Sequence, residues 1–408
     1  MSGDSLSISQ TGLQAVDSAM QAVSDNLANA QTTAFNQESI EFSTLLGEFI
    51  AGNPLGGGVA EQGLIRDFSQ GSLTQSNSPT DVAIQGNGFF VLQDAQNNQF
   101  FSRNGHMTVS ADGTLVGFNG DQVLGFGLSG AANPGAVMGP INVPQGVLAP
   151  SASTTVTNTG NLDSTASVIA KPIDPTDSTT FNCSQSVQVY DSLGNAHVLT
   201  YFFQNAGPAG GNEQWNWTAT LDGSTAGLAN NTGTLAFDNT GKLVGGGTPP
   251  ALTATPAGAA PLKLALDFTG MTQYATPTAT NSVADGNAVG RPQGVQIDNN
   301  GIVSVSYSNG QTVKIAQLAI ATFTSNQGLQ LSSNGAYQQT RSSGTPTVSA
   351  ANAGAAGSIQ SGALESSNVD TTSQLVSLVV LQRSFQANAK ALQTQDNILG
   401  TVVQITTT

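Results

Sequence analysis

The sequence contains little charge and few cations. Charged residues make up 9% of its 408 residues, against about 25% in typical soluble globular chains. Ten Lys and Arg stand against 25 Asp and Glu, so the formal net charge is -15. Binding to nucleic acids or to an anionic membrane surface needs clustered cations, and the sequence shows no such cluster. We therefore exclude nucleic acids and charged membrane surfaces as partners.

Cysteine and long apolar runs are also scarce. Cys183 is the single cysteine, so no disulfide can form within the chain, and we interpret it as a small buried or half-buried thiol. No run of 18 apolar residues predicts a transmembrane helix, so we expect no membrane insertion. The first six residues have neither the basic region of a Sec-type signal peptide nor an apolar stretch after it. We expect a chain that is cytoplasmic or is exported without a cleavable signal peptide.

Residues that could support catalysis or bind a metal are few and scattered. The two histidines, His106 and His197, lie in no HxxH or HExxH pattern, which makes the case for a metal site weak. Asp112-Gly113 lacks the spaced carboxylates of a calcium loop, and no G-x-S-x-G nucleophile motif occurs. A pairing of Cys183 with a histidine would suggest a nucleophile, but a buried thiol is the simpler interpretation. We predict a protein that is not an enzyme and needs no cofactor or metal.

Apolar residues recur at alternating three- and four-residue steps near both ends of the chain. This spacing predicts two helices, over about residues 5–33 and 371–401, each with an apolar seam of the kind a coiled coil needs. Such a stripe is more often the buried face of a globular helix, but its position at the extreme termini favours a role in assembly. The predicted assembly seam consists of Leu13, Val16, Met20, Val23 and Leu27 near the start and Leu378, Leu381, Phe385, Asn388, Leu392 and Leu399 near the end.

Two positions of the C-terminal segment have a predicted role of their own. Asp370 is the predicted N-cap of the last helix. Asn388 is an amide inside the seam, where a buried amide can fix the register of a coiled coil. Our hypothesis is that Asn388→Leu stabilises the helix but degrades ordered assembly, and normal assembly of that variant would count against it.

Everything between the two helices is predicted to be β-strands and turns. Arg103-Asn-Gly105, Asp112-Gly113 and Asn119-Gly120 are predicted hairpin turns between short apolar runs. Trp215 and Trp217 alternate with polar residues, as on a strand with one buried face. Glycine- and proline-rich stretches at residues 52–58, 130–150 and 285–290 predict flexible connections.

The predicted fold is mainly β with α-helical termini that form a coiled-coil-like layer and with two nested β-domains. We expect paired terminal helices over residues 1–33 and 363–408 and a connector over residues 34–77. A discontinuous middle β-domain would cover residues 78–150 and 285–362, and an outer β-domain inserted into it would cover residues 151–284.

Four segments, in the same order along the chain, resemble the bacterial flagellar axial proteins of the rod and hook group. They are Asp25-Asn-Leu-Ala-Asn-Ala-Gln-Thr-Thr-Ala-Phe35, Asp81-Val-Ala-Ile-Gln-Gly-Asn-Gly-Phe-Phe90 with Ser102-Arg-Asn-Gly105, Gly362-Ala-Leu-Glu-Ser-Ser-Asn-Val-Asp370, and Gln382-Arg-Ser-Phe-Gln-Ala-Asn-Ala-Lys390. The positions that match the family motifs are Asn26, Asn29, Phe35, Gly88, Phe89, Phe90, Arg103, Asn104, Gly105, Asn368, Asp370, Gln382 and Arg383. The sequence departs from the pattern at Ala34, where the family usually has Gly.

The inserted segment, with Val189-Tyr-Asp-Ser-Leu-Gly-Asn-Ala-His197, is similar to the outer domain of hook-type members of this group. The resemblance implies a structural subunit of the hook that polymerises with itself into a flexible curved tube and transmits torque from rod to filament. It also implies an extracellular location on the flagellum, type III export, and contacts with the distal rod, the hook cap, the hook-filament junction protein and the export apparatus.

Two alternatives remain open at this point. The first is a distal rod protein with an inserted domain, which would form a straight tube. The second is a secreted β-rich adhesin in which Trp215 and Trp217 form a sugar-stacking platform, which would require these side chains to be exposed. The sequence does not define the helical lattice, the handedness or the hook length.

Overall fold

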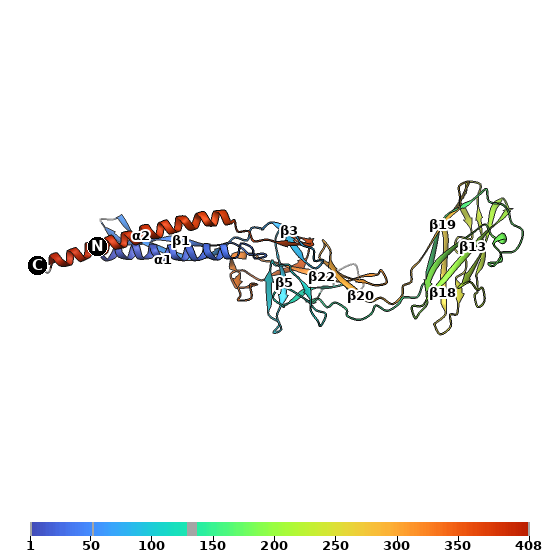
Figure 1. Cartoon of the computed structure of the whole chain (residues 1–408), viewed down its shortest axis with the longest axis horizontal. Coiled ribbons are helices and arrows are strands. Elements are labelled where there is room, and N and C mark those ends of the chain that lie inside the picture. Colours follow the sequence, from blue (N-terminus) through green and yellow to red (C-terminus); the bar gives the residue numbers. More distant parts are fainter. Residues whose placement is uncertain (1, 51–52, 129–136, 407–408) are drawn as a thin grey trace. The chain divides into compact units, whose positions relative to one another are not determined.

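The computed structural model describes residues 2–50, 53–128 and 137–406 (Figure 1). The chain is mainly β, with one helix at each end: α1 spans Ser2–Ala28 and α2 spans Thr371–Thr406. It divides into two compact units, the first with residues 1–143, 295–305 and 313–408 and the second with residues 144–294 and 306–312. Among the described residues, neither helix is apolar enough over a sufficient length to cross a membrane.

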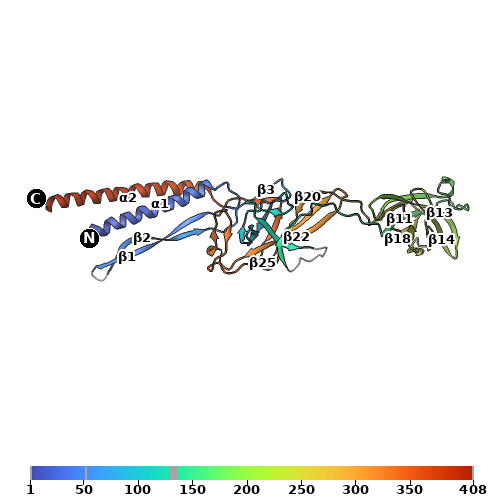
Figure 2. The same ribbon diagram turned by 90° about the horizontal axis from the view of Figure 1, so that it is seen from below.

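The two helices of the first unit run antiparallel and lie side by side (Figures 1 and 2). Asp370, the predicted N-cap, accepts hydrogen bonds from the backbone N–H of Thr372 (2.9 Å) and from the hydroxyl of Ser373 (2.9 Å). These bonds hold the pKa of Asp370 below its ordinary value. The bond from Thr372 also satisfies one of the backbone N–H donors that the first turn of a helix leaves without intrahelical partners.

Strands β1 (Glu38–Ile50) and β2 (Asn53–Arg66) form a long antiparallel hairpin beside α1 (Figure 2). The sequence predicted a connector over residues 34–77 and a flexible loop at residues 52–58. Instead, residues 53–58 belong to β2, and residues 51 and 52 lie outside the described part of the chain. The register shifts where Leu45 faces Gly58 and Leu46 faces Gly56, so the glycines are accommodated as a β-bulge and do not end the strand.

The rest of the first unit is built from short strands. The path β20-β21-β22-β9-β5-β6-β24-β23 forms its main sheet, while β26 pairs with β4 and β27 with β3, so that the end of the β region returns to its beginning. The strands are β3 Leu73–Gln75, β4 Val82–Gln85, β5 Phe89–Gln93, β6 Gln99–Ser102, β7 Thr108–Val109, β8 Leu115–Val116, β9 Gln122–Gly127, β10 Met138–Pro140, β20 Pro292–Ile297, β21 Ile302–Tyr307, β22 Thr312–Thr322, β23 Gln330–Leu331, β24 Tyr337–Gln338, β25 Thr347–Ala350, β26 Ser358–Ser361 and β27 Ala363–Glu365.

The main sheet is buried on both faces. Successive residues of β5 enter two different apolar clusters, with Phe90 in one and Phe89 in the other, because side chains alternate across a strand. The turns at Asp112-Gly113 and Asn119-Gly120 join paired strands, as predicted. The predicted turn at Arg103-Asn-Gly105 is wrong, because β6 and β7 do not pair with each other.

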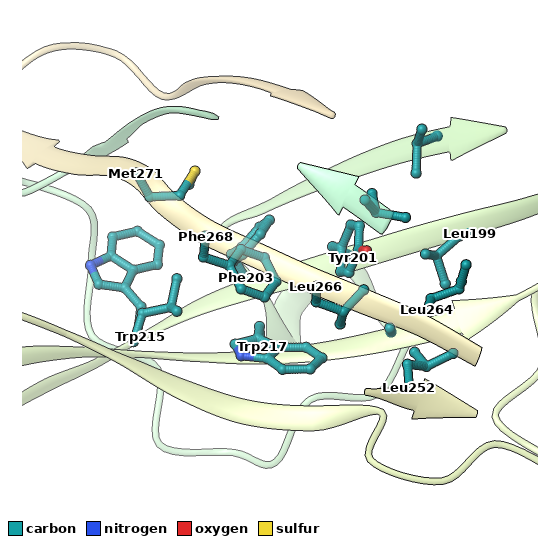
Figure 3. Packing of buried hydrophobic residues seen from close by; sticks show 14 of the residues in the cluster. Leu199, Tyr201, Phe203, Trp215, Trp217, Leu252, Leu264, Leu266, Phe268 and Met271 are labelled. Atoms are coloured by element: carbon teal, nitrogen blue, oxygen red, sulfur yellow. The ribbon is translucent and has the colours of Figure 1, made fainter. Parts of the chain in front are cut away.

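The second unit packs two sheets around one core (Figure 3). One sheet has the order β17-β18-β11-β19 and the other the order β12-β13-β14-β15-β16. The strands are β11 Thr155–Asp163, β12 Cys183–Tyr190, β13 Ala196–Ala209, β14 Asn212–Leu221, β15 Thr232–Phe237, β16 Leu243–Gly245, β17 Leu252–Ala254, β18 Leu262–Tyr274 and β19 Ala279–Ala284. Short 3-10 turns occur at Ser178–Thr180 and, in the first unit, at Asn326–Gly328.

The core of the second unit is aromatic. Trp215 and Trp217 both point from β14 into it, are at most 1% exposed and lie among Tyr201, Phe203 and Phe268 (Figure 3). The ring centroids of Trp217 and Phe268 are 5.3 Å apart. A sugar-stacking platform needs exposed aromatic faces, so the adhesin alternative is wrong in its central premise.

Two of the segments predicted as flexible connections are hydrogen-bonded to each other within the second unit. The N–H of Leu148 donates to the carbonyl of Gly290 (2.7 Å), and the N–H of Gly290 donates back to Leu148 (3.1 Å). Ser151 and Asn287 exchange the same pair of bonds. Residues 130–136 of the predicted connection at 130–150 lie outside the described residues.

Candidate assembly site and the junction at its base

Asn26 fixes the end of α1 to the start of β1. Its side chain is 1% exposed and forms two hydrogen bonds with the backbone of Glu38, one donated and one accepted, each of 2.7 Å. Its amide also donates to Oε1 of Gln374 on α2 (3.3 Å). Only an amide can both donate and accept in this way, which explains why Asn is needed at this motif position.

The remaining residues of the N-terminal motif turn the chain after α1. Asn29 accepts a hydrogen bond from the Thr32 hydroxyl (3.1 Å) and donates to the carbonyl of Asp25 (3.1 Å). Ala34 then adopts a φ of 58°, in the left-handed region that favours glycine. Its N–H donates to the carbonyl of Glu365 (2.8 Å). The turn thereby meets the C-terminal motif.

Asn368 ties the C-terminal motif to the N-terminal one. Its side-chain oxygen accepts from the N–H of Gln37 (2.7 Å), and its amide donates to the carbonyls of Asp67 (2.8 Å) and Ser69 (3.0 Å). Its own N–H donates to the carbonyl of Phe35 (3.3 Å). One side chain therefore holds three segments that are distant in sequence.

Arg103, from the second motif, is buried next to this junction. Its Nη1 is 3.5 Å from Oε2 of Glu365 and donates to the carbonyl of Ile84 (3.3 Å), and its guanidinium lies 5.7 Å from the ring centroid of Phe89. Burial lowers the pKa of Arg103 and raises the pKa of Glu365, while the charge of each partner opposes the shift of the other. A buried ion pair of this kind adds little net stability but restricts the geometry of the segments that carry it.

This motif forms no hairpin turn, and its glycine, Gly105, is required because another part of the backbone lies very close to it. A Cβ at this position would lie 1.7 Å from the carbonyl oxygen of Val82. The preceding Asn104 side chain accepts from the N–H of His106 (3.0 Å), and Gly88 leads directly into β5 with Phe89 and Phe90. Close backbone approach is invisible in a sequence pattern, so the turn prediction failed here.

The structure brings most of the motif residues together at this junction, but it leaves Gln382 and Arg383 exposed along α2. Among the described residues, no group of three or more His, Cys, Asp or Glu side chains is placed to hold a metal ion. The junction connects the end of α1 and the start of α2 to the β region of the first unit.

The predicted seam of α1 is only half-buried in the monomer. Leu13, Val16, Met20, Val23 and Leu27 are all of intermediate exposure, whereas the buried positions of α1 are Ala15, Ala22 and Asn26. On α2, Leu378, Leu381, Asn388 and Leu392 are half-buried and Phe385 is exposed. The side chain of Leu399 lies outside the described residues. Small residues thus occupy the buried positions of α1, and its larger apolar residues remain partly accessible.

Sequence reasoning missed a second apolar row on α2. Leu375, Val376, Val379 and Val380 are exposed, with Val376 61% and Val380 55% accessible. They recur at i, i+1, i+4 and i+5, which is helical spacing but lies outside the heptad positions. The signal is present in the sequence: these four apolar residues form a second row on the helix, next to the predicted heptad seam.

Comparisons with known proteins agree with this architecture. Family models match residues 83–164 (flagellar hook protein FlgE/F/G D1 domain), 161–286 (flagellar basal body protein FlaE D2 domain) and 360–405 (flagellar basal body rod FlgEFG protein C-terminal). The chain is 34% identical to the flagellar hook protein FlgE of Salmonella typhimurium over 98% of this chain and 100% of that protein. It is 33% identical to FlgE of Escherichia coli, over 97% and 98% of the two chains.

A solved structure also resembles this chain. The crystal structure of Helicobacter pylori flagellar hook protein FlgE2 matches with a TM-score of 0.51 at 16% sequence identity, covering 72% of this chain and 100% of that one. At this identity the match supports the fold alone.

Proposed function

The chain belongs to the flagellar hook protein FlgE family, and we propose that it is the structural subunit of the hook, polymerising with itself into a flexible curved tube that transmits torque from rod to filament. The observation that carries this proposal is the apolar surface that the helical part of the monomer leaves open, above all Val376 and Val380 on α2. Monomeric soluble proteins rarely leave such rows uncovered, and large exposed apolar patches mark interaction sites.

The junction supports a role in transmitting force. Asn26, Asn368, Arg103 and Glu365 connect the ends of both helices to the β region by buried or half-buried polar contacts. We propose that α1 and α2 pair as a coiled-coil-like layer at the inside of the tube. The middle β-domain would form the tube wall, and the inserted outer β-domain would form its outer surface. Rigid β-domains of this kind can slide as bodies while their connections absorb the change.

The proposal includes the location and partners that the resemblance implies. The subunit would be exported by the flagellar type III apparatus without a cleavable signal peptide and would stand outside the cell. It would contact the distal rod, the hook cap and the hook-filament junction protein. The matched relatives are named as hook proteins, which disfavours the distal rod alternative, and none of the matched family models describes an enzyme.

Electron microscopy tests the proposed function. The purified full chain and a version without residues 1–33 and 363–408 are placed in polymerising conditions and imaged. Curved tubes from the full chain and none from the truncated chain are the expected result. Straight tubes would support the rod alternative, and tubes from the truncated chain would show that the terminal helices are not the assembly site.

A further inference from the structure

The open end of the β1–β2 hairpin is a pair of residues whose backbone groups point away from each other. Glu38 of β1 faces Arg66 of β2 there, and one step further out the N–H of Asp67 donates to the carbonyl of Gln37 (2.8 Å). Hydrogen-bonded and non-hydrogen-bonded pairs alternate along antiparallel strands, so the pair Glu38–Arg66 is non-hydrogen-bonded. Its N–H and C=O groups point outward from both strands and need partners outside the hairpin.

A side-chain amide occupies each of these two outer edges. On the β1 edge, Asn26 of α1 exchanges two hydrogen bonds with the backbone of Glu38. On the β2 edge, Gln327 does the same for Arg66: its Oε1 accepts from the N–H (3.3 Å) and its Nε2 donates to the carbonyl (2.5 Å). Between the two edges, Nη2 of Arg66 lies 2.7 Å from Oε1 of Glu38. The four residues therefore form a continuous chain of polar contacts across the open end of the hairpin.

Gln327 belongs to a turn that the β region holds in place. The turn, Asn326–Gly328, lies between β22 and β23 of the main sheet. A Cβ at Gly328 would collide with the backbone of Ser343, and the carbonyl of Gly328 accepts from the Thr340 hydroxyl (2.5 Å). This close packing limits the movement of the turn. Gln327 thus attaches the hairpin to a fixed point of the main sheet, although it lies outside all four segments that match the family motifs.

We propose that Gln327 is a positioning residue that couples the β1–β2 hairpin, and through it α1, to the main sheet. Asn26 forms the helical end of this coupling and Gln327 forms the sheet end. Without Gln327, the backbone of Arg66 has water in place of a fixed partner, and its ion pair with Glu38 gains freedom. The role goes beyond the proposed function and is independent of polymerisation, because all of these contacts lie within one chain.

Hydrogen exchange of single backbone amides in the monomeric full chain tests the coupling. In Gln327→Met the side chain keeps its length but loses both hydrogen-bonding atoms. We expect the amide of Arg66 to exchange at least fivefold faster than in the unmodified chain, and the amide of Glu38, on the opposite edge, at least twofold faster. Gln327→Glu keeps the shape and the acceptor but loses the donor at neutral pH, so it should give an intermediate rate at Arg66.

Gln330→Met is the matched control, because Gln330 is exposed on β23, three residues along the chain. Both amides should exchange in this variant as in the unmodified chain. Rates are compared with those of amides in β5, in the same unit, so that a general loss of stability cannot imitate the effect. An unchanged Arg66 amide in Gln327→Met would overturn the role of Gln327. Faster exchange at Arg66 with an unchanged rate at Glu38 would show a purely local contact and would overturn the coupling.

Discussion

At the scale of single residues, the junction contains two positions, Ala34 and Gly105, at which the backbone favours glycine. One of them carries alanine and the other carries glycine. Ala34 carries a Cβ although its left-handed backbone conformation favours glycine. At Gly105 a Cβ would collide with the neighbouring backbone, so only glycine fits. The first position stores conformational strain and the second avoids a collision. Both can be tested by exchanging Ala and Gly.

We predict that Ala34→Gly stabilises the chain. Relief of the left-handed strain should contribute about 1 kcal/mol, less a few tenths for the greater freedom of glycine in the unfolded state. Chemical denaturation followed by circular dichroism measures the change. Ala387→Gly, at an exposed position in the interior of α2, is the control and should instead destabilise by about 1 kcal/mol. A loss of stability in Ala34→Gly would contradict the strain at this position.

Gly105→Ala should have the opposite effect. The added methyl would collide with the carbonyl of Val82, and overpacking of this kind costs about 1–3 kcal/mol. Gly127→Ala provides the comparison, because nothing lies within 4 Å of its added Cβ, and its stability should stay within about 0.5 kcal/mol. Equal unfolding midpoints for the two variants would show that the backbone can yield at residue 105.

At the scale of elements, a titratable cluster joins the β12–β13 hairpin of the second unit to the end of β14. Nδ1 of His197 lies 2.7 Å from Oδ2 of Asp222, and its Nε2 lies 3.5 Å from Oδ2 of Asp191. The hydrogen bond with Asp222, and secondarily that with Asp191, raises the pKa of His197. Hydrogen bonds from Asn195, with smaller contributions from Leu193 and His197, lower the pKa of Asp191 to about 2.

These shifts predict how stability of the second unit depends on pH. Protonated His197 stabilises the folded state, so its contribution is complete below its unfolded pKa of about 6.5 and is lost as pH rises through the higher folded value. Both tryptophans lie in this unit, so tryptophan fluorescence of the full chain reports its unfolding midpoint. The midpoint should fall as the pH rises above about 6.5. His197→Gln should remove most of that dependence, whereas His106→Gln should retain it.

Local patterns in the sequence predicted the elements well where one physical signal dominated. The alternation of Trp215 and Trp217 with polar residues predicted a strand with one buried face, and both side chains are buried on β14. The predicted loop at residues 52–58 is wrong where the chain forms a bulged strand, because a bulge and a turn can have the same glycine content. The buried side of α1 differs from the predicted seam. Two alanines and an amide are buried there, and the larger apolar residues of the seam are not.

The junction could be predicted only in part. The motif residues were identified from the sequence, but their roles depend on contacts such as Asn368 with Gln37 that join segments more than 300 residues apart. No local pattern encodes such a pairing. The approach of Val82 to Gly105 is likewise a tertiary contact that became evident only in the structure.

At the scale of the whole molecule, the two units have separate apolar cores. All residues of the aromatic cluster around Trp217 belong to the second unit, whereas both helices belong to the first. Each core can therefore be lost without direct exposure of the other. Cooperative unfolding in a single step holds best for single domains.

We predict that the full chain unfolds in two distinguishable transitions. Circular dichroism at the helical minimum follows the first unit, and tryptophan fluorescence follows the second. The two denaturation curves should not coincide. A variant that affects only one core, such as Leu264→Ala in the second unit, should shift the fluorescence curve by about 2–5 kcal/mol and leave the helical signal unchanged. Superimposable curves for both probes would show that the two cores unfold as one.

The reciprocal hydrogen bonds between Leu148 and Gly290 have an evolutionary consequence. Leu148 and Gly290 lie near the two ends of the long segment of the second unit, residues 144–294, and are direct neighbours, so everything between them can be exchanged at one seam. A shorter, longer or unrelated insert with adjacent ends would leave the flanking backbone where it is. Recombination can therefore diversify this module, including any epitopes it presents, while the junction and the helices stay under separate constraint.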